Sequence, residues 1–471
     1  MLVYPRVKDI AKFMMSIKLP LATGIGIVLL ASNASALPAF ARQTGQSCVA
    51  CHVGGQFPEL TPYGRQFKLT GYTLGQQTNP LAIMVVADYA KTSKNTDSAG
   101  TTVSPLSGKA IVDYASLFAG GRITDNIGAF AQITYSFHDQ QSSSGAWTGH
   151  LGSDNTDIRF ADHLVENDQD LIYGFTLHNN PSVQDVWNSA PAWSYPYVAA
   201  SGNAAATGAP PYLTALEGGF AQQVAGLGAY AYWNHTVYAE LTAYRSTTGP
   251  LSALAIGNAT GDSAHPKTFV EGYNPYVRLA YTKDWGSNSV MVGLTSFKIG
   301  SYVNDSNNNQ PQYSLGTIKQ TDTALDAQYQ YLSEPYTATA QVRWIHERIS
   351  DPNNLALQDQ VSASLNSFRT KASLTYRSQF GASLSFFNVS GTSDSSYNPT
   401  SPSTTAVASA TNSPNTRGWT PEAFWLPEPN IRVGLQYTAF TKYLGESTNY
   451  DGAGRKASDN NTLYLYGWYA Y

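Results

Sequence analysis

The residues whose types and spacing point most specifically to chemistry are Cys48, Cys51 and His52, within the string CVACH. Two cysteines two residues apart, followed directly by a histidine, are typical of covalent attachment of a c-type haem. Each thiol adds across one vinyl group of the porphyrin, and the adjacent imidazole binds the iron as its proximal ligand. The competing interpretation is a disulfide or redox-active CxxC pair beside an unrelated histidine. Because both cysteines of the chain fall in this motif, we predict one c-type haem as the cofactor.

A second axial ligand for the iron is not evident near the motif. Residues 37–79 contain no methionine and no histidine other than His52. The distal ligand then comes from the rest of the chain, is Lys68 or water, or is absent. Met84 is the nearest methionine in sequence. We take it as the candidate distal ligand, with simple packing inside the protein as the alternative.

Aromatic and basic residues flank the motif. We expect the apolar ones to cover the porphyrin, and the basic ones either to pair with its propionates or to lie on a solvated surface. A segment as short as residues 37–79 rarely forms a sufficient core alone, so the haem and a larger body are expected to support it. The covering set is Phe40, Phe57, Leu60, Tyr63 and Phe67, and the basic set is Arg42, Arg65 and Lys68.

The N-terminus has the features of a secretory signal peptide. Basic residues precede a mostly apolar stretch at 19–31, and Ala34-Ser35-Ala36 forms a small-x-small cleavage site. The apolar stretch is about 13 residues long, whereas a membrane-spanning helix needs about 20. We therefore expect residues 1–36 to be removed and the remaining chain to be exported.

From residue 81 onward the dominant pattern is alternation of apolar and polar residues over segments of about ten residues, which predicts β-strands. The stretch 127–138 shows it clearly, because Ile, Ala, Tyr and Phe at odd positions alternate with Gln132, Thr134, Ser136 and His138. Sixteen strands can be placed in this way. Their approximate ranges are 81–90, 109–120, 126–138, 155–164, 169–179, 221–233, 235–246, 274–285, 288–300, 321–332, 335–349, 366–378, 380–391, 416–426, 430–443 and 461–471.

The connections between these strands alternate in length. Short turns such as 121–125 and 285–287 alternate with long polar loops such as 139–154 and 247–273. Outer-membrane barrels combine short periplasmic turns with long extracellular loops. The sequence therefore predicts an all-β fold, a sixteen-stranded antiparallel transmembrane β-barrel over residues 80–471, in the outer membrane of a Gram-negative bacterium. An even number of strands returns both termini to the periplasmic side, so the haem segment is expected at the periplasmic mouth or within the lumen.

Charge is scarce in this chain. Only 13% of residues are Asp, Glu, Lys or Arg, against about 25% in typical soluble proteins. Nucleic-acid binding requires a basic stripe that neutralises phosphates, so we exclude nucleic acid as a partner. A barrel explains the scarcity, because one parity of each strand faces outer-membrane lipid and cannot carry charge.

The polar parity of several strands is expected to face the lumen. These side chains form either a hydrated, salt-bridged wall or a set of contacts that hold the haem segment as a plug or line a cation route. The candidates are Asp157, Arg159, His163, Asp322, Asp326, Gln328, Gln330, Arg343 and Glu347.

The longest loop, about 180–220, has an unusual composition. It contains five prolines together with Trp187, Trp193, Tyr195 and Tyr197. A loop waving freely in water would leave this aromatic surface exposed. We therefore expect the loop to fold into the lumen and narrow it.

An N-terminal CxxCH unit joined to a sixteen-stranded barrel resembles the fused outer-membrane monohaem cytochrome-porins of iron-oxidising bacteria. The resemblance implies one-electron transfer from extracellular Fe(II) to a periplasmic c-type cytochrome, an Fe(II):cytochrome c oxidoreductase activity. The competing functions are a passive porin with a structural or sensing haem, and outward, reductive transfer of respiratory electrons. The resemblance rests on residues 38–45, 48–52, 64–68, 173–181, 184–187 and 455–462.

Overall fold

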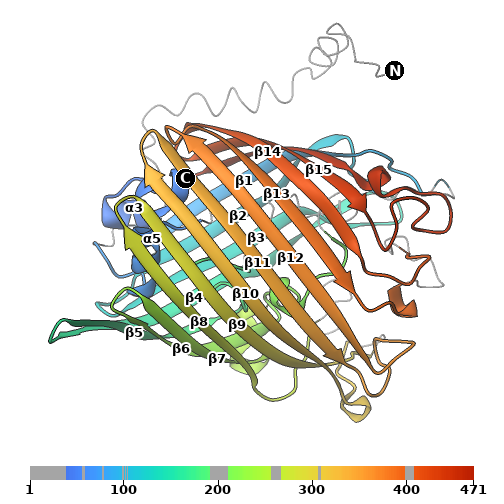
Figure 1. Ribbon diagram of the computed structural model, residues 1–471, viewed down its shortest axis with the longest axis horizontal. Coiled ribbons are helices and arrows are strands. Elements are labelled where there is room, and N and C mark those ends of the chain that lie inside the picture. Colours follow the sequence, from blue (N-terminus) through green and yellow to red (C-terminus); the bar gives the residue numbers. More distant parts are fainter. Residues whose placement is uncertain are drawn as a thin grey trace, which may run out of the picture.

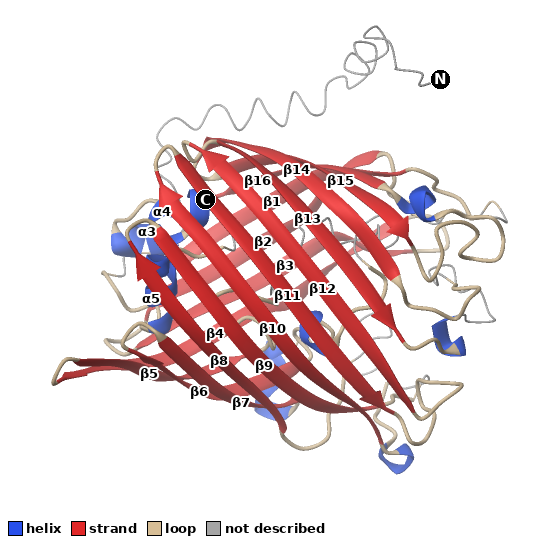
Figure 2. Ribbon diagram, viewed as in Figure 1, coloured by secondary structure: helices blue, strands red, loops and turns tan. Residues whose placement is uncertain are grey.

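Sixteen antiparallel strands close into one barrel in the computed structural model (Figures 1 and 2). Neighbours in sequence are neighbours in the sheet, and β1 closes the barrel against β16. The structure describes residues 39–55, 59–76, 79–97, 100, 102, 104–190, 210–255, 267–305, 309–397 and 408–471. The strands are β1 (Leu81–Thr92), β2 (Lys109–Arg122), β3 (Ile127–Gln141), β4 (Trp147–Glu166), β5 (Gln169–His178), β6 (Val224–Trp233), β7 (Val237–Ser246), β8 (Asn274–Trp285), β9 (Asn288–Tyr302), β10 (Thr317–Ser333), β11 (Tyr336–Ser350), β12 (Ser362–Tyr376), β13 (Phe380–Gly391), β14 (Thr416–Glu428), β15 (Ile431–Lys442) and β16 (Thr462–Ala470).

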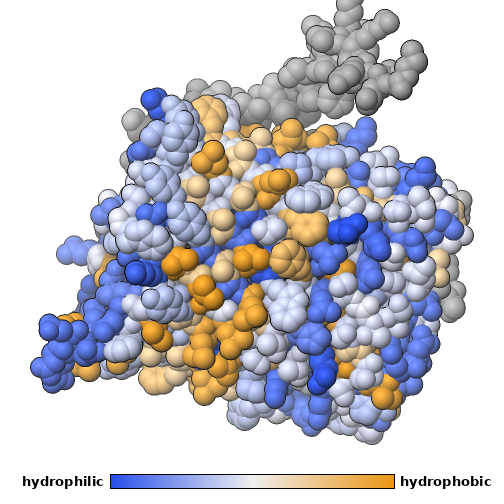
Figure 3. All heavy atoms as spheres, in the orientation of Figure 1, coloured by the Kyte–Doolittle hydropathy of each residue, from blue (hydrophilic) through white to orange (hydrophobic). Residues whose placement is uncertain are grey.

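The two faces of the sheet differ as the alternation predicts. Leu294 lies beside Leu279 and Leu325 on neighbouring strands, and these three side chains are between 42% and 51% exposed. Their chain neighbours Arg278 and Asp326 point inward and are buried. Figure 3 shows hydrophobic side chains gathered over the strands. A closed sheet with an apolar exterior satisfies all its backbone groups in lipid, so the chain is a membrane-spanning barrel of the outer-membrane type, as the sequence predicts.

The ends of the barrel differ in the length of their connections. The seven connections at one end have two to four residues, whereas those at the other end have up to 45. We call these the short-turn end and the long-loop end. Predicted strand positions are confirmed, with one clear error at the loop expected over 139–154. There β3 and β4 continue as a paired hairpin, and only residues 142–146 connect them.

The error over 139–154 has a physical cause. Polar residues, together with Gly149 and Gly152, interrupt the alternation of apolar and polar residues in the first part of β4. Glycine suits position 149, because a Cβ there would lie 2.8 Å from the backbone carbonyl oxygen of Ser136 on the paired strand. Backbone pairing, rather than an alternating apolar face, therefore defines this part of β4.

The helices are short and are not part of the sheet. The N-terminal segment forms α3 (Ala39–Thr44), α4 (Cys48–Cys51), η1 (Val53–Gly55) and α5 (Pro62–Leu69), and Figure 1 places α3 and α5 at the barrel end where the chain terminates. None of the described helices is long and apolar enough to cross a membrane. The remaining turns of helix are η3 (Ala215–Glu217), η4 (Gly249–Leu254), η5 (Tyr313–Leu315), η6 (Ser395–Tyr397) and η7 (Ala457–Asn460).

Candidate cofactor site

The CxxCH motif forms a single helical turn. Cys48 and Cys51 begin and end α4, and residues three apart lie on the same face of a helix. His52 follows as the C-cap, and its backbone N–H donates to the Cys48 carbonyl at 2.8 Å. The local fold therefore places both thiols on one side of the turn, with the imidazole next in sequence.

Cys48, Cys51 and His52 line one cavity inside the barrel, and most of its wall is apolar. The cavity contains about 1390 Å³ of empty space, which includes its opening to solvent. Its walls come from the N-terminal segment, from β1 to β3 and from the loop that follows β5. Aromatic and aliphatic lining residues include Phe40, Leu60, Phe67, Tyr72, Phe118 and Phe130.

Met84 lies in the wall of this same cavity. It is on β1, 3% exposed, with Ala82 and Val86 on the same inward-facing side. The structure thus brings Met84 together with the three residues of the motif. It also adds Tyr72, Phe118 and Phe130, which the sequence prediction missed. The lumen-facing positions of a water-filled barrel are usually polar. The apolar residues at these positions on β1 to β3 were the sequence signal that could have indicated this cavity.

The turn that carries the thiols is held by α5. The Thr61 hydroxyl caps this helix by accepting from the Gly64 N–H at 3.2 Å, and it donates to the Ala50 carbonyl at 2.5 Å. A Cβ at Gly64 would lie 2.1 Å from the Cys51 carbonyl oxygen. Only glycine allows the two backbones to approach so closely, so α5 fixes the position of α4.

The surroundings of the thiols bear on whether the motif is a redox-active pair. Burial raises the pKa of Cys48, and burial together with the neighbouring Cys48 raises the pKa of Cys51 to about 11. A redox-active CxxC pair needs a lowered pKa on its attacking thiol. Two protonated thiols, an adjacent imidazole, a thioether and apolar walls instead fit a c-type haem.

The residues expected to cover the porphyrin divide into three groups. Phe40, Leu60 and Phe67 line the cavity. Tyr63 is not among the lining residues and is 37% exposed, so its expected role is not supported. Phe57 lies outside the described residues.

The three basic residues do not act as a set. Lys68 lines the cavity, and its ammonium group donates to the Val183 carbonyl and lies 3.8 Å from Asp157. Burial, opposed by the nearby Asp157, lowers the pKa of Lys68 to about 8. Arg42 donates to the Leu81 carbonyl, and Arg65 is buried against the barrel wall. Only Lys68 is therefore placed to pair with an acidic group in the cavity.

Arg65 of α5 binds the barrel wall at β9 and β10. Its guanidinium donates to Gln330 at 2.9 Å, to Ser289 at 2.8 Å and to the Leu60 carbonyl at 2.8 Å. The Gln330 amide donates in turn to the same carbonyl at 3.0 Å. Lys371 of β12 pairs with Glu59 at 2.5 Å. Strands β9, β10 and β12 thus hold one side of the segment.

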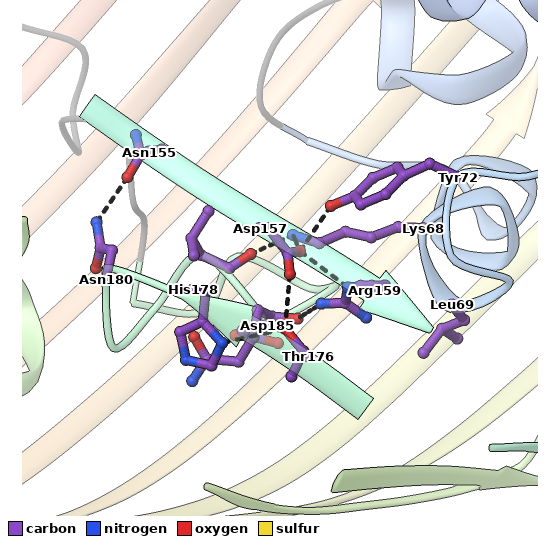
Figure 4. A network of polar contacts seen from close by, with 12 residues as sticks. Lys68, Leu69, Tyr72, Asn155, Asp157, Arg159, Thr176, His178, Asn180 and Asp185 are labelled. Atoms are coloured by element: carbon purple, nitrogen blue, oxygen red, sulfur yellow. Dashed lines mark hydrogen bonds and ion pairs between the residues drawn. The ribbon is translucent and has the colours of Figure 1, made fainter. Parts of the chain in front are cut away.

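The opposite wall holds the segment through a buried polar network (Figure 4). Tyr72 and Lys68 point from the segment toward Asp157 of β4, and the Tyr72 hydroxyl donates to it at 2.7 Å. Arg159 donates to the same carboxylate at 2.9 Å. Tyr230 of β6 donates to the Leu69 carbonyl at 2.6 Å. The described part of residues 39–76 is therefore a plug bound on both sides, as one alternative for the lumen-facing residues predicts.

His163 does not share this role. The prediction placed it in the lumen, but its side chain is 43% exposed and pairs with Asp170 at 2.6 Å. The alternation correctly predicts that His163 lies on the same side of β4 as Asp157 and Arg159. It does not predict that this part of β4 lies beyond the lumen. Pairing between β3 and β4 ends at Phe160, so β4 carries His163 past the rim of the barrel.

The loop between β5 and β6 also enters the lumen. Asp185 binds Arg278 at 3.2 Å, and the Ser189 hydroxyl donates to Asp326 at 2.5 Å. Further along the loop, Glu217 binds Arg343 and Arg369 at 2.5 and 2.7 Å. The backbone N–H groups of Ala215 and Leu216 donate to Glu347 and Asp322, both at 2.7 Å. The expected inward folding is confirmed for the described residues; Trp193, Tyr195 and Tyr197 lie outside them.

The described residues contain no group of three or more His, Cys, Asp or Glu side chains that could hold a metal ion.

No protein-family model matches the chain, and no curated protein matches it. Among solved structures, the chain is similar to the outer membrane channel DcaP of Acinetobacter baumannii, with 11% identity and a TM-score of 0.44 over 83% of this chain and 96% of that chain. It is also similar to OmpF of Salmonella typhi in a complex with daunomycin, with 10% identity and a TM-score of 0.44 over 83% and 97% of the two chains. A third similar structure is an anion-selective porin from Comamonas acidovorans, with 12% identity and a TM-score of 0.40 over 83% and 98%.

Replacing Arg65 with alanine is expected to loosen the plug while leaving the barrel closed. Hydrogen bonds from a charged donor each contribute about 1.5–3 kcal/mol, so local opening of α5 should become easier by about 2 kcal/mol or more. This corresponds to roughly 30-fold faster amide hydrogen exchange in α5. The matched control is Arg348→Ala, since Arg348 is exposed on β11. Equal exchange of α5 in both variants would contradict the anchoring role.

The docking of the infolded loop should depend on acidity through Glu217. Burial opposes its ionisation, but Arg369 and Arg343 outweigh burial and lower the pKa of Glu217 to about 2. Its stabilising contribution is complete above the ordinary pKa of 4.5 and is lost as the pH falls through about 2. Single-channel conductance should therefore rise within this window and not near neutrality.

The Glu217→Gln variant should already conduct more at neutral pH and should lack this acid-dependent step. Glu446→Gln, which neutralises an exposed loop carboxylate, should retain it. An identical conductance profile for Glu217→Gln and the unmodified protein would show that Glu217 does not dock the loop.

Proposed function

We propose that this protein transfers electrons across the outer membrane through one c-type haem attached to Cys48 and Cys51. One observation carries the proposal: both thiols, the His52 imidazole and the Met84 thioether line a single, largely apolar cavity inside the barrel. The proposed donor is extracellular Fe(II) and the proposed acceptor is a periplasmic c-type cytochrome. Both follow the resemblance to the cytochrome-porins of iron-oxidising bacteria. One electron leaves Fe(II), which becomes Fe(III), and reduces one ferric cytochrome to the ferrous form.

The residues of the plug have the chemistry that attachment requires. In each addition the sulfur bonds to one vinyl carbon and the thiol hydrogen moves to the other, so no external oxidant is consumed. A free cysteine has a pKa of about 8.5, so the hydrogen needed for addition is present on each sulfur of the unfolded chain at neutral pH. His52 on the plug and Met84 on the barrel wall are the two residues that would hold the iron, because both line the cavity. When bound, a c-type haem supplies reversible one-electron transfer, and a Met/His ligand pair raises its potential.

A single haem cannot carry an electron across a hydrocarbon core about 25 Å tall, so the position of the plug along the barrel matters. Short turns of outer-membrane barrels face the periplasm, so the plug lies on the periplasmic side of the lumen. A periplasmic acceptor docks beneath it, and the donor approaches from the long-loop end. Asp88 and Asp113 are buried next to each other on the inner faces of β1 and β2, further toward that end than Met84.

A passive porin is the second candidate. It is favoured by the closed barrel and by the ionised and amide side chains along its inner wall, which suit a path for hydrated solutes. The plug and the infolded loop narrow this path. In this function the cofactor is structural or sensing, and no electron leaves the protein.

Two measurements on the purified full-length protein separate the candidates. Stopped-flow mixing with Fe(II) should reduce the covalently bound haem, one per chain, and solute flux in liposomes should stay far below that of an open porin. The Cys48→Ala/Cys51→Ala variant should lose covalent haem on denaturing gels, whereas Ser47→Ala, in the residue that precedes α4, should retain it. Absence of haem, or no reduction by Fe(II) at any pH, would exclude the electron-transfer function. Rapid solute flux without reduction would favour the passive porin.

The role of Met84 is tested by comparing the two methionines of the barrel. Met84→Leu should abolish the thioether-to-iron charge-transfer absorption and lower the haem potential by on the order of 0.1 V, because axial ligands set this potential. Met291→Leu is the control, since Met291 is equally buried but packs against Trp187 and Arg278. If both variants keep the absorption and the potential, Met84 is not a ligand.

A further inference from the structure

One hairpin projects beyond the rim of the barrel. Pairing of β4 with β3 ends at Phe160, so from Ala161 onward β4 pairs with β5 alone, and pairing of β5 with β6 begins only at Leu171. Every residue from 162 to 169 is exposed. Figure 1 shows β5 and its partner strand extending past the other strands at the lower left. We call residues 162–170 the rim hairpin.

The rim hairpin is acidic and contains no lysine or arginine. Asp162, Glu166, Asp168 and Asp170 lie within nine residues, with His163 as the one basic side chain. The described part of the short-turn end is negative overall because of the rim hairpin, since the charged groups of the other short turns almost balance, four carboxylates against three cations. They are the carboxylates of Asp125, Asp284, Glu334 and Glu428 and the cations of Arg122, Lys283 and Arg377.

Two apolar side chains stand among these charges. Leu164 and Val165 are 52% and 67% exposed, and exposed apolar residues rimmed by charged ones are typical of protein interfaces. The tip is a tight turn in which Asn167 and Asp168 adopt positive φ angles of 48° and 62°. The base is fixed because the Asp170 carboxylate binds both His163 and His235, at 2.6 and 3.1 Å. The hairpin is therefore a preformed surface.

The base of the rim hairpin touches the plug. A Cβ at Gly71, just after α5, would lie 3.3 Å from the Ala161 Cβ, where the hairpin leaves the barrel. A Cβ at Gly128 would lie 2.1 Å from the Gly71 carbonyl oxygen. A protein bound to the hairpin consequently lies next to the segment that carries Cys48 and Cys51.

We propose that the rim hairpin is the docking surface for the soluble electron acceptor, and that this acceptor presents a lysine-rich face around its redox centre. The proposal rests on the proposed function, which places the short-turn end in the periplasm. Complementary charge steers two proteins together and speeds association. Negative charge at this position also disfavours contact with anionic lipid headgroups. The charge of the rim hairpin therefore favours a cationic protein as its partner.

The test uses the haem-loaded full-length protein in detergent micelles and a lysine-rich soluble c-type cytochrome as the probe. The docking variant combines Asp162→Asn, Glu166→Gln and Asp168→Asn. The control variant combines Asp139→Asn, Asp359→Asn and Glu446→Gln, which make the same change of charge at the long-loop end. We expect the docking variant to bind the probe about tenfold more weakly at low salt, and the control variant to bind as the unmodified protein does.

Acetylating the lysines of the probe should weaken its binding to the unmodified protein to the same degree, because acetylation removes their charge. Equal affinity of both variants, or undiminished binding of the acetylated probe, would overturn the docking surface. These outcomes are separable from failure of the proposed function. If Fe(II) does not reduce the haem, binding can still be lost in the docking variant; if Fe(II) reduces it, binding can still be unaffected.

A second measurement locates the surface. Asp168→Cys should react with a membrane-impermeant maleimide only after the outer membrane is permeabilised, with the unmodified protein giving the background. Labelling of Asp168→Cys in intact cells would place the rim hairpin outside the cell and overturn the proposal.

Discussion

Pairing of charges inside the lumen is the interaction on which the rest of the structure depends. Asp157, Arg159 and Arg278 are almost fully buried on the inner wall, and a buried charge is tolerated only when it is paired and hydrogen-bonded. Strand neighbours supply some partners, such as Asp326 for Arg278. The remainder come from segments that enter the lumen, since Asp157 also receives the Tyr72 hydroxyl. The inner wall, the plug and the infolded loop therefore each supply partners for buried charges or polar groups of the others.

The inner wall is divided into two chemically different parts. Next to the plug, β1 to β3 present Met84, Phe118 and Phe130 to the cavity, whereas Asp88 and Asp113 lie further along β1 and β2. From β4 to β12 it presents polar groups such as Asp157 and Gln330, which bind the plug. The polar part fixes the plug in position, and the apolar part encloses the space next to the cysteines. The apolar cavity therefore lies where these polar contacts hold the plug against β1 to β3.

Much of the fold was predictable because each strand has one face in lipid. The resulting alternation fixed the number of strands and most of their positions; it failed over 139–154, where pairing continues without a regular lipid-facing stripe. The spacing of the CVACH motif was enough to predict that Cys48, Cys51 and His52 belong to one site. Contacts between distant residues, such as Arg65 with Gln330, could not be predicted, because a strand pattern contains no information about what fills the lumen. For the same reason Tyr72 and Phe118 were missed and the depth of His163 was wrong.

The enclosure of the plug has a consequence for biogenesis. Cys48 and Cys51 lie on a segment held between opposite walls by Arg65 and Tyr72, and the segment continues directly into β1. An attaching enzyme cannot reach a turn of helix inside a closed barrel. A covalent cofactor at these cysteines must accordingly be installed while the chain is still unfolded in the periplasm, before the strands assemble. For such a cofactor, maturation would precede membrane insertion, and the barrel would close around a finished prosthetic group.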